Sequence, residues 1–251
     1  MKKNINDWAP PEKPSEITES RLIQAFLDGT FPVGSNLPGE RELSQLLGVT
    51  RPTLRETLQR LEKDGWVTIN HGKPTHVNNF LEEGKLGVSI ALAQYQKPTP
   101  STFVTNLLAA RVLLAPTYAY LAVRNDSTKI AEFVQSKLAL SDDAQTFALF
   151  DWKLHWTLAK YSGNYFFVHL MNSIQDLYAV IGAHYFESSI TKEHSLGFYS
   201  ELKNLVENSN ADQVKILVKK TMQESCDLWE SLTSHQDQFG PHKNDVYGND
   251  D

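Results

Sequence analysis

Two arginines at the start of one expected helix are the residues of this chain best suited to nucleic-acid chemistry. Arg51 and Arg55 lie four residues apart in "TRPTLRETLQRL", so they share one helical face, with Thr53 beside them. A guanidinium offers two parallel donors that match guanine O6 and N7, or a phosphate. The same pattern also fits a solvated face with pairs such as Arg51–Glu56 and Arg55–Gln59. The surrounding elements must decide between these interpretations.

Those elements have the order of a winged helix-turn-helix. The sequence predicts a helix over 40–47, which Gly48 ends in a left-handed cap, and Thr50 then caps the helix that carries the arginines. The strands "WVTIN" and "THVNNF" follow, joined by a hairpin at 71–74. The apolar stripe of the second helix is Leu54, Leu58 and Leu61. Because a recognition helix meets base edges at its N-terminal end, this context favours DNA binding.

A second group of polar and aromatic side chains falls inside apolar helical segments later in the chain. Each member is ordinarily a hydrogen-bonded core residue, but together they could line a ligand site. Asp151 and His155 form D-x-x-x-H, one helical turn apart, so that their side chains point to the same place. The whole group is Arg111, Asp151, His155, Tyr185, Tyr199, Ser225 and Trp229.

Composition excludes several classes of protein. No stretch reaches the roughly 18 to 20 apolar residues that span a bilayer, so we expect no membrane partner. The N-terminus lacks the apolar run of a secretory signal, and the single Cys226 cannot form an internal disulfide, which suits the cytoplasm. The chain shows no nucleophile elbow, phosphate-binding glycine loop or paired metal histidines. We therefore expect no catalytic activity and no cofactor.

The negative charge lies in the second part of the chain. The formal net charge is −6, but residues 1–80 carry no net charge. Only this first part could approach a polyanion without general repulsion.

The periodicity changes after residue 80, which divides the chain into a DNA-binding part and an all-α bundle. We expect a mainly α protein, with a winged helix-turn-helix followed by a bundle of about seven helices. The expected domains are a flexible arm at 1–15, the winged helix-turn-helix at 16–80, a linker and connecting helix at 81–101, a helical effector-binding and dimerisation bundle at 102–234, and a disordered tail at 235–251. The expected helices after residue 80 are 86–96, 102–124, 128–141, 143–162, 164–186, 191–208 and 210–233.

The stretch "LPGERELSQLLGVTRPTLRETLQRLEKDGWVTINHGKPTHVNNF" resembles the DNA-binding domain of the GntR family of bacterial repressors. The motifs "GAHYF", "SLGFYSELKNLV", "ADQV" and "ESCDLW" extend the resemblance to the fatty acid metabolism regulator (FadR) group, over about residues 16–233. The resemblance implies a homodimer that binds a palindromic double-stranded operator as a transcription regulator.

The resemblance also implies which residues contact the operator. Pro52 departs from the small polar residue of the family, which puts one phosphate contact in doubt. The residues that the resemblance assigns to phosphates and bases are Arg41, Thr50, Arg51, Thr53 and Arg55, and the tip of the wing is His71, Gly72 and Lys73.

For the second domain, the resemblance implies long-chain fatty acyl-CoA as the effector. Tyr185, Ser225 and Trp229 match positions around the acyl-CoA site of the group, and Met222 stands where the family has glycine. Arg111 could meet the CoA phosphates. The expected effector residues are Arg111, Tyr185, Tyr199, Met222, Ser225 and Trp229.

A metal-bound carboxylate is the alternative effector. Many relatives with such a domain bind zinc through an Asp-x-x-x-His pair and two later histidines. This chain offers Tyr199 and Gln223 there, although His184 or His194 could substitute. We therefore predict no metal site.

Overall fold

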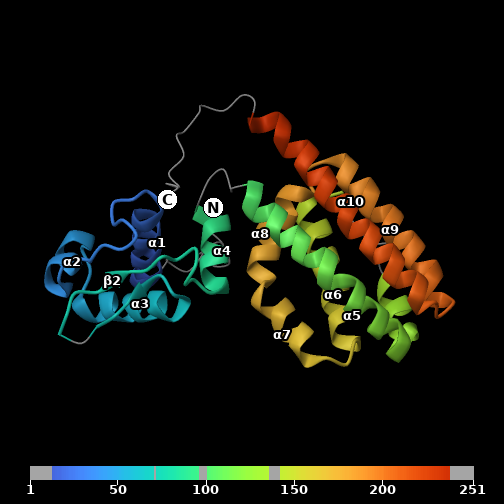
Figure 1. Cartoon of the computed structure of the whole chain (residues 1–251), viewed down its shortest axis with the longest axis horizontal. Helices are drawn as coiled ribbons and strands as arrows, with labels where there is room; N and C mark the ends of the chain where they lie inside the picture. Colours follow the sequence, from blue (N-terminus) through green and yellow to red (C-terminus); the bar gives the residue numbers. More distant parts are fainter. Residues whose placement is uncertain (1–12, 71, 96–100, 136–141, 238–251) are drawn as a thin grey trace, which may run out of the picture. The chain divides into compact units, whose positions relative to one another are not determined.

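The computed structural model describes residues 13–70, 72–95, 101–135 and 142–237, which form two units. The first unit ends at Thr99 and the second begins at Pro100 (Figure 1). Most of the predicted arm and tail, and His71, lie outside the described residues. The remaining parts of the arm and tail are helical, since α1 begins at Pro14 and α10 continues to Asp237.

The N-terminal unit is the predicted winged helix-turn-helix. Its helices are α1 (Pro14–Leu27), α2 (Glu40–Leu47), α3 (Arg51–Asp64) and α4 (Leu86–Tyr95). Gly48 adopts the predicted left-handed cap after α2, with φ 69°. The wing strands are shorter than predicted: β1 (Val67–Thr68) pairs antiparallel with β2 (His76–Val77), in the register Val67↔Val77.

The apolar stripe of α3 is fully inside the core of this unit. Leu54, Leu58 and Leu61 are buried, and α1 contributes Leu22, Ile23 and Phe26. The ring of Trp66 lies between Phe26 and Phe80, with ring centroids 5.8 and 4.7 Å away. The core therefore fixes which face of α3 points outward.

Helix α4 belongs to this same core. Val88, Ala91 and Leu92 are buried in the cluster that α1 and α3 form. Gly87 allows α4 to approach the end of α3, because a Cβ on Gly87 would lie 2.4 Å from the Asp64 carboxyl carbon. The segment predicted as a linker and connecting helix thus contributes to the fold of the DNA-binding unit.

The C-terminal unit is an all-α bundle, as predicted. Its helices are α5 (Ser101–Gln135), α6 (Ala144–Tyr161), α7 (Tyr165–Ser173), α8 (Gln175–Tyr185), α9 (Ser189–Glu207) and α10 (Ala211–Asp237). Helix α5 has a break at Asp126, whose φ of −157° is not helical. This break agrees with the predicted gap at 125–127.

The single helix predicted over 164–186 is wrong. The chain departs from helical geometry at Ile174, with φ −104° and ψ 8°, and this residue ends α7 and caps α8. Neither a glycine nor a proline marks this position. The two short helices let both Met171 and Leu177 be buried.

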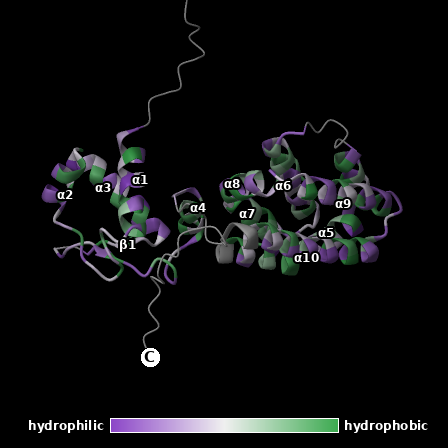
Figure 2. Cartoon of the chain, turned by 90° about the horizontal axis from the view of Figure 1, so that it is seen from above, coloured by the Kyte–Doolittle hydropathy of each residue, from purple (hydrophilic) through white to green (hydrophobic). Residues whose placement is uncertain are grey.

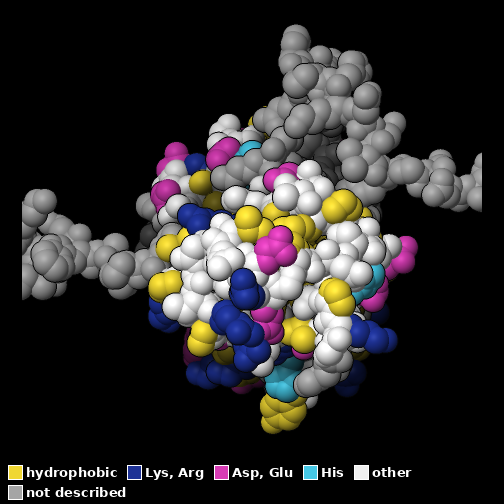
Figure 3. All heavy atoms as spheres, turned by 90° about the vertical axis from the view of Figure 1, so that its left-hand side faces the viewer, with side chains coloured by type: hydrophobic (Ala, Val, Ile, Leu, Met, Phe, Trp, Pro, Cys, Tyr) yellow, Lys and Arg dark blue, Asp and Glu magenta, His cyan; other side chains and the backbone are white. Residues whose placement is uncertain are grey.

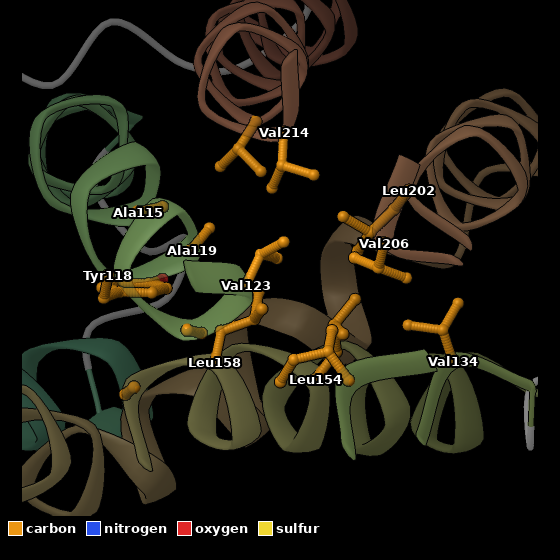
Figure 4. Packing of buried hydrophobic residues seen from close by; sticks show 14 of the residues in the cluster. Ala115, Tyr118, Ala119, Val123, Val134, Leu154, Leu158, Leu202, Val206 and Val214 are labelled. Atoms are coloured by element: carbon orange, nitrogen blue, oxygen red, sulfur yellow. The ribbon is translucent and has the colours of Figure 1, made fainter. Parts of the chain in front are cut away.

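Helices α5, α6, α9 and α10 enclose the main core of the bundle. Figure 4 shows Val123 of α5 close to Leu158 of α6, with Val214 of α10 and Leu202 and Val206 of α9 on the other sides of this core. Small alanines on α5 let α10 approach closely, because an alanine adds no bulk between the two backbones. Figure 2 shows that the helices of the bundle carry both hydrophobic and hydrophilic residues.

Helix α5 is more apolar than we expected. From Val104 to Gln135 it is long and apolar enough to cross a membrane, which contradicts the expectation that no stretch is. In this fold α5 contacts α6, α9 and α10, and 39% of its apolar window is buried.

We predict that Gly65→Ala destabilises the N-terminal unit by roughly 2 kcal/mol or more. Gly65 caps α3 with φ 90°, and an added Cβ would lie 2.7 Å from the carbonyl oxygen of Glu83. Urea denaturation measures the change. Gly39→Ala is the control, because Gly39 has φ −56° and open space around it; the free energy of unfolding should change by no more than about 1 kcal/mol, the cost of alanine at the N-cap of α2. Equal stability of the two variants would contradict the prediction.

Candidate nucleic-acid interface and buried polar centre

The start of α3 is built to present two arginines. Thr50 is the N-cap, and its hydroxyl accepts a hydrogen bond from the backbone N–H of Thr53 at 3.3 Å. Pro52 lies in the first turn, where its missing N–H has no intrahelical partner to lose. Arg51 and Arg55 remain 55% and 59% exposed, although Leu54 between them is buried.

One carboxylate holds both guanidiniums. Glu40, the first residue of α2, lies 3.5 Å from Arg51 Nη2 and 2.7 Å from Arg55 Nε. Arg51 and Arg55 therefore both pair with Glu40, and not with Glu56 and Gln59 as a solvated helix face would suggest. The pairing brings the starts of α2 and α3 together and keeps the two guanidiniums side by side. Free donors on both remain available to an acceptor in solution.

The other predicted DNA contacts lie around this pair. Arg41 is exposed in the first turn of α2, and the Thr53 hydroxyl contacts that of Thr50 at 2.8 Å. Figure 3 shows Lys and Arg side chains gathered on one face of the N-terminal unit, with acidic side chains among them. In the wing, Lys73 is exposed, and its N–H donates to Asn70 O at 3.2 Å, so that Gly72 and Lys73 form a tight turn.

The second site is a charged centre buried in the C-terminal unit. Asp151 on α6 is 8% exposed, and its Oδ2 lies 3.2 Å from Arg111 Nη2 on α5. The hydroxyl of Tyr178 on α8 donates to Oδ2, and that of Tyr199 on α9 donates to Oδ1 at 2.8 Å. Burial alone would raise the pKa of Asp151, but the guanidinium and the two tyrosine hydrogen bonds outweigh it and lower this pKa. Asp151 is therefore a carboxylate.

His155 completes the centre as a neutral ring. Its Nε2 lies 2.9 Å from Arg111 Nη2, and its Nδ1 lies 2.7 Å from the hydroxyl of Tyr118. Burial lowers the pKa of His155 to about 4, and the charge of Arg111 acts in the same direction. Because an arginine N–H can only donate, Nε2 must accept, so the ring proton lies on Nδ1 and is donated to Tyr118.

The same arrangement bears on the metal alternative. The guanidinium of Arg111 occupies the place between Asp151 and His155 that a shared cation would need. His194 instead pairs with Glu224 at 3.0 Å, and His184 pairs with Glu187 at 3.1 Å. Within the described residues, no group of three potential ligands could hold a metal ion.

A pocket opens beside Arg111. It is small, with about 30 Å³ of enclosed space, which is room for one or two water molecules, so a larger ligand would have to widen it. Arg111 Nε, a buried atom of one lining residue, makes no hydrogen bond, whereas the Tyr185 hydroxyl has Ser225 as its neighbour. An unpaired buried donor costs free energy, so Arg111 Nε could accommodate an acceptor. The lining residues are Val104, Leu107, Leu108, Arg111, Asp151, Tyr178, Ile181, Gly182, Tyr185 and Phe186.

The other predicted effector residues lie at different distances from this pocket. Trp229 stacks on Tyr185 with ring centroids 6.5 Å apart, and its Nε1 is also buried without a partner. Ser225, one helical turn before Trp229, donates to Thr221 O at 2.9 Å. Met222 is buried in the main core and is not among the lining residues. Tyr199 serves the Asp151 centre.

Sequence reasoning missed Tyr118 and Tyr178. Both follow helical spacing in apolar segments, where a tyrosine is ordinarily core. The one signal is that Asp151 and His155, placed inside an apolar helix, each require several polar partners from other helices. Which helices supply them depends on the fold.

Comparisons with known proteins agree on both units. Residues 14–77 match the model for bacterial regulatory proteins of the gntR family, and residues 78–239 match the model for the FadR C-terminal domain.

Several similar proteins are named fatty acid metabolism regulator protein. The fatty acid metabolism regulator protein of Shewanella frigidimarina is 39% identical over 219 residues, which is 87% of this chain and 92% of the relative. The protein of that name from Yersinia enterocolitica is 38% identical over 88% of this chain and 92% of its own length. A solved structure of Lar, which controls expression of the Listeria monocytogenes agr system, covers 89% of this chain and all of its own, with a TM-score of 0.51 and 14% identity. That likeness shows the fold.

We predict that acid destabilises the C-terminal unit through His155. The pKa of His155 is depressed in the folded chain to about 4, so the unfolded chain binds more protons between about pH 6.5 and 4, and stability falls as the pH drops through this window. The loss between pH 7 and 5 should be about 2 kcal/mol. Urea denaturation at both pH values measures it.

His155→Gln should remove this pH-dependent component, whereas His169→Gln, at an exposed position, should retain it. An equal pH dependence in wild type and His155→Gln would refute the assignment.

Proposed function

Because this chain belongs to the GntR family of bacterial regulatory proteins and carries a FadR C-terminal domain, we propose that it is a homodimeric regulator of fatty acid metabolism whose operator binding is relieved by long-chain fatty acyl-CoA. The family and the fold make it a DNA-binding transcription regulator. Its place of action is the cytoplasm, where operator DNA lies.

The pair of guanidiniums on Glu40 is the observation that carries the DNA-binding part of the proposal. Glu40 keeps Arg51 and Arg55 side by side at the N-terminal end of α3, the end that enters a major groove in helix-turn-helix proteins. Two such helices, one from each subunit, read the two halves of a palindromic operator. A dimer is required because one small reader contacts too few bases for tight specific binding.

The pocket beside Arg111 supports the effector part of the proposal. Its walls are mainly apolar, with Leu107, Leu108 and Ile181 among them, which suits an alkyl chain. Arg111 Nε would meet the polar end of that chain. In this proposal the acyl part of the ligand widens and enters the pocket, and the CoA part extends outside it.

Release of DNA requires that acyl-CoA bind the DNA-free arrangement more tightly than the DNA-bound one. In this proposal the ligand displaces α5 within the bundle. The displacement reaches the DNA-binding unit through α4, which is part of the core of that unit.

We predict that Arg51→Ala and Arg55→Ala each cost about 1–3 kcal/mol in operator binding and relax the base preference where the arginine binds. Lys73→Ala, in the wing, should lower the affinity for all DNA sequences and make the salt dependence of binding shallower.

Fluorescence anisotropy with operator and scrambled duplexes at several salt concentrations measures both effects. Light scattering of the complex should give two chains per operator. Wild-type affinity in the Arg51/Arg55 double variant would refute the DNA-binding assignment, and one chain per operator would refute the dimer.

We predict that operator release strengthens with acyl-chain length. Each buried methylene contributes about 0.8 kcal/mol, so C16 and C18 acyl-CoA should act far more strongly than short-chain acyl-CoA or free CoA. Trp229→Ala should weaken the acyl-CoA response and leave operator affinity unchanged, because Trp229 belongs to the other unit. Met222 lies in the main core and not in the pocket lining, so Met222→Gly should leave the tolerated range of chain lengths unchanged.

Calorimetry with C16 acyl-CoA decides between this effector and the metal alternative. No heat with acyl-CoA, together with zinc binding that His155→Ala abolishes, would favour a metal-bound carboxylate.

A further inference from the structure

Arg51 and Arg55 share one oxygen of a single carboxylate. Glu40 Oε2 lies 2.7 Å from Arg55 Nε and 3.5 Å from Arg51 Nη2, and the side chain of Glu40 is itself 33% exposed. Two guanidiniums and one carboxylate leave one net positive charge at this surface. The contacts with Glu40 involve one nitrogen of each arginine, so the other N–H donors of both guanidiniums remain for DNA.

The other basic residues of the predicted interface are not held in this way. In the part of the chain that the structure describes, neither Arg41 nor Lys73 has a carboxylate within ion-pair distance. Arg41 directly follows Glu40 in the first turn of α2, and Lys73 lies in the wing. The DNA-binding unit therefore offers two kinds of cation: single charges that lack an acidic partner, and a pair that already has one.

A phosphate and a base edge make different demands on this pair. A phosphate is negative, so it must either replace Glu40 or lie beside it. Replacement exchanges one anion for another and gains little, and approach without replacement brings two negative charges together. Guanine O6 and N7 are neutral acceptors, so they can take the remaining donors of Arg51 or Arg55 while Glu40 stays in place.

We propose that Glu40 is a specificity-determining residue: it weakens the pairing of Arg51 and Arg55 with phosphates and leaves their contacts with base edges intact. This inference rests on the proposed operator binding and goes beyond it by assigning sequence discrimination to an acidic residue. Affinity for DNA of any sequence comes from neutralised phosphates. Glu40 therefore lowers the affinity for nonspecific DNA, whereas the specific complex keeps its base contacts.

The test compares Glu40→Gln with Glu42→Gln, which removes the same charge from the same turn of α2. Glu42 is exposed, whereas the carboxylate that holds the two arginines belongs to Glu40. The specific probe is the duplex that wild type enriches from a random-sequence library. The nonspecific probe is a scrambled duplex of the same length and base composition. Fluorescence anisotropy at several salt concentrations gives the affinity of the full-length chain for both.

Glu40→Gln should bind the scrambled duplex about three- to tenfold more tightly than wild type, and the selected duplex less than about twofold more tightly. The ratio of the two affinities therefore falls. The slope of log K against log [salt] for the scrambled duplex should become steeper by about one to two, because each of two subunits gains a phosphate contact. Glu42→Gln should change both affinities by the same factor and leave their ratio unchanged.

A double-mutant cycle separates an effect through the arginines from a general effect of charge. When Arg51→Ala and Arg55→Ala are already present, Glu40→Gln has no guanidinium to release. In that background Glu40→Gln should raise the affinity for the scrambled duplex no more than Glu42→Gln does.

Each outcome bears on one of the two proposals. Failure of wild type to enrich any sequence, or equal affinity for the two duplexes, would refute operator binding. An unchanged affinity ratio in Glu40→Gln, or the same loss of ratio in Glu42→Gln, would refute the role of Glu40 alone. A ratio that falls only because the selected duplex binds more weakly would mean that Glu40 supports the base contacts and does not oppose phosphates, which also overturns the proposal.

Discussion

A single carboxylate inside an apolar bundle constrains the C-terminal unit. Asp151 cannot stay ionised there unless charge and hydrogen bonds reach it from other helices, and they come from α5, α8 and α9. Packed apolar side chains resist displacement as well, but these hydrogen bonds add a direction, and they cannot lengthen by an ångström without being lost. The network therefore sets how the helices are placed along one another, while Leu154, Leu158 and their neighbours supply the burial.

Both units place one carboxylate between cationic or polar partners, with different results. Glu40 and its two arginines are in contact with water, so their pairing can be exchanged for contacts with another anion. Asp151 and Arg111 are largely buried, so their pairing is retained. Exposure thus separates an ion pair that another anion can replace from one that holds helices together.

The sequence predicted the DNA-binding unit in detail because its signals are local. Thr50, Pro52 and Gly48 act through their own backbone geometry, and the leucine stripe of α3 fixes the outward face of Arg51 and Arg55. The break at Ile174 has no local signal, so it could not be predicted. Tyr118 and Tyr178 meet the Asp151 centre only because distant helices come together, and Met222 matched a family position while lying in the core.

The place of α4 determines where this chain can be divided. The two family models meet between residues 77 and 78, but Val88, Ala91 and Leu92 complete the core built by α1 and α3. A DNA-binding unit truncated at residue 77 would lose part of its core and expose apolar surface. A hybrid regulator that joins this DNA-binding unit to another effector domain would have to retain the chain through Tyr95. The segment that folds as the DNA-binding unit is therefore longer than the segment that matches the DNA-binding family.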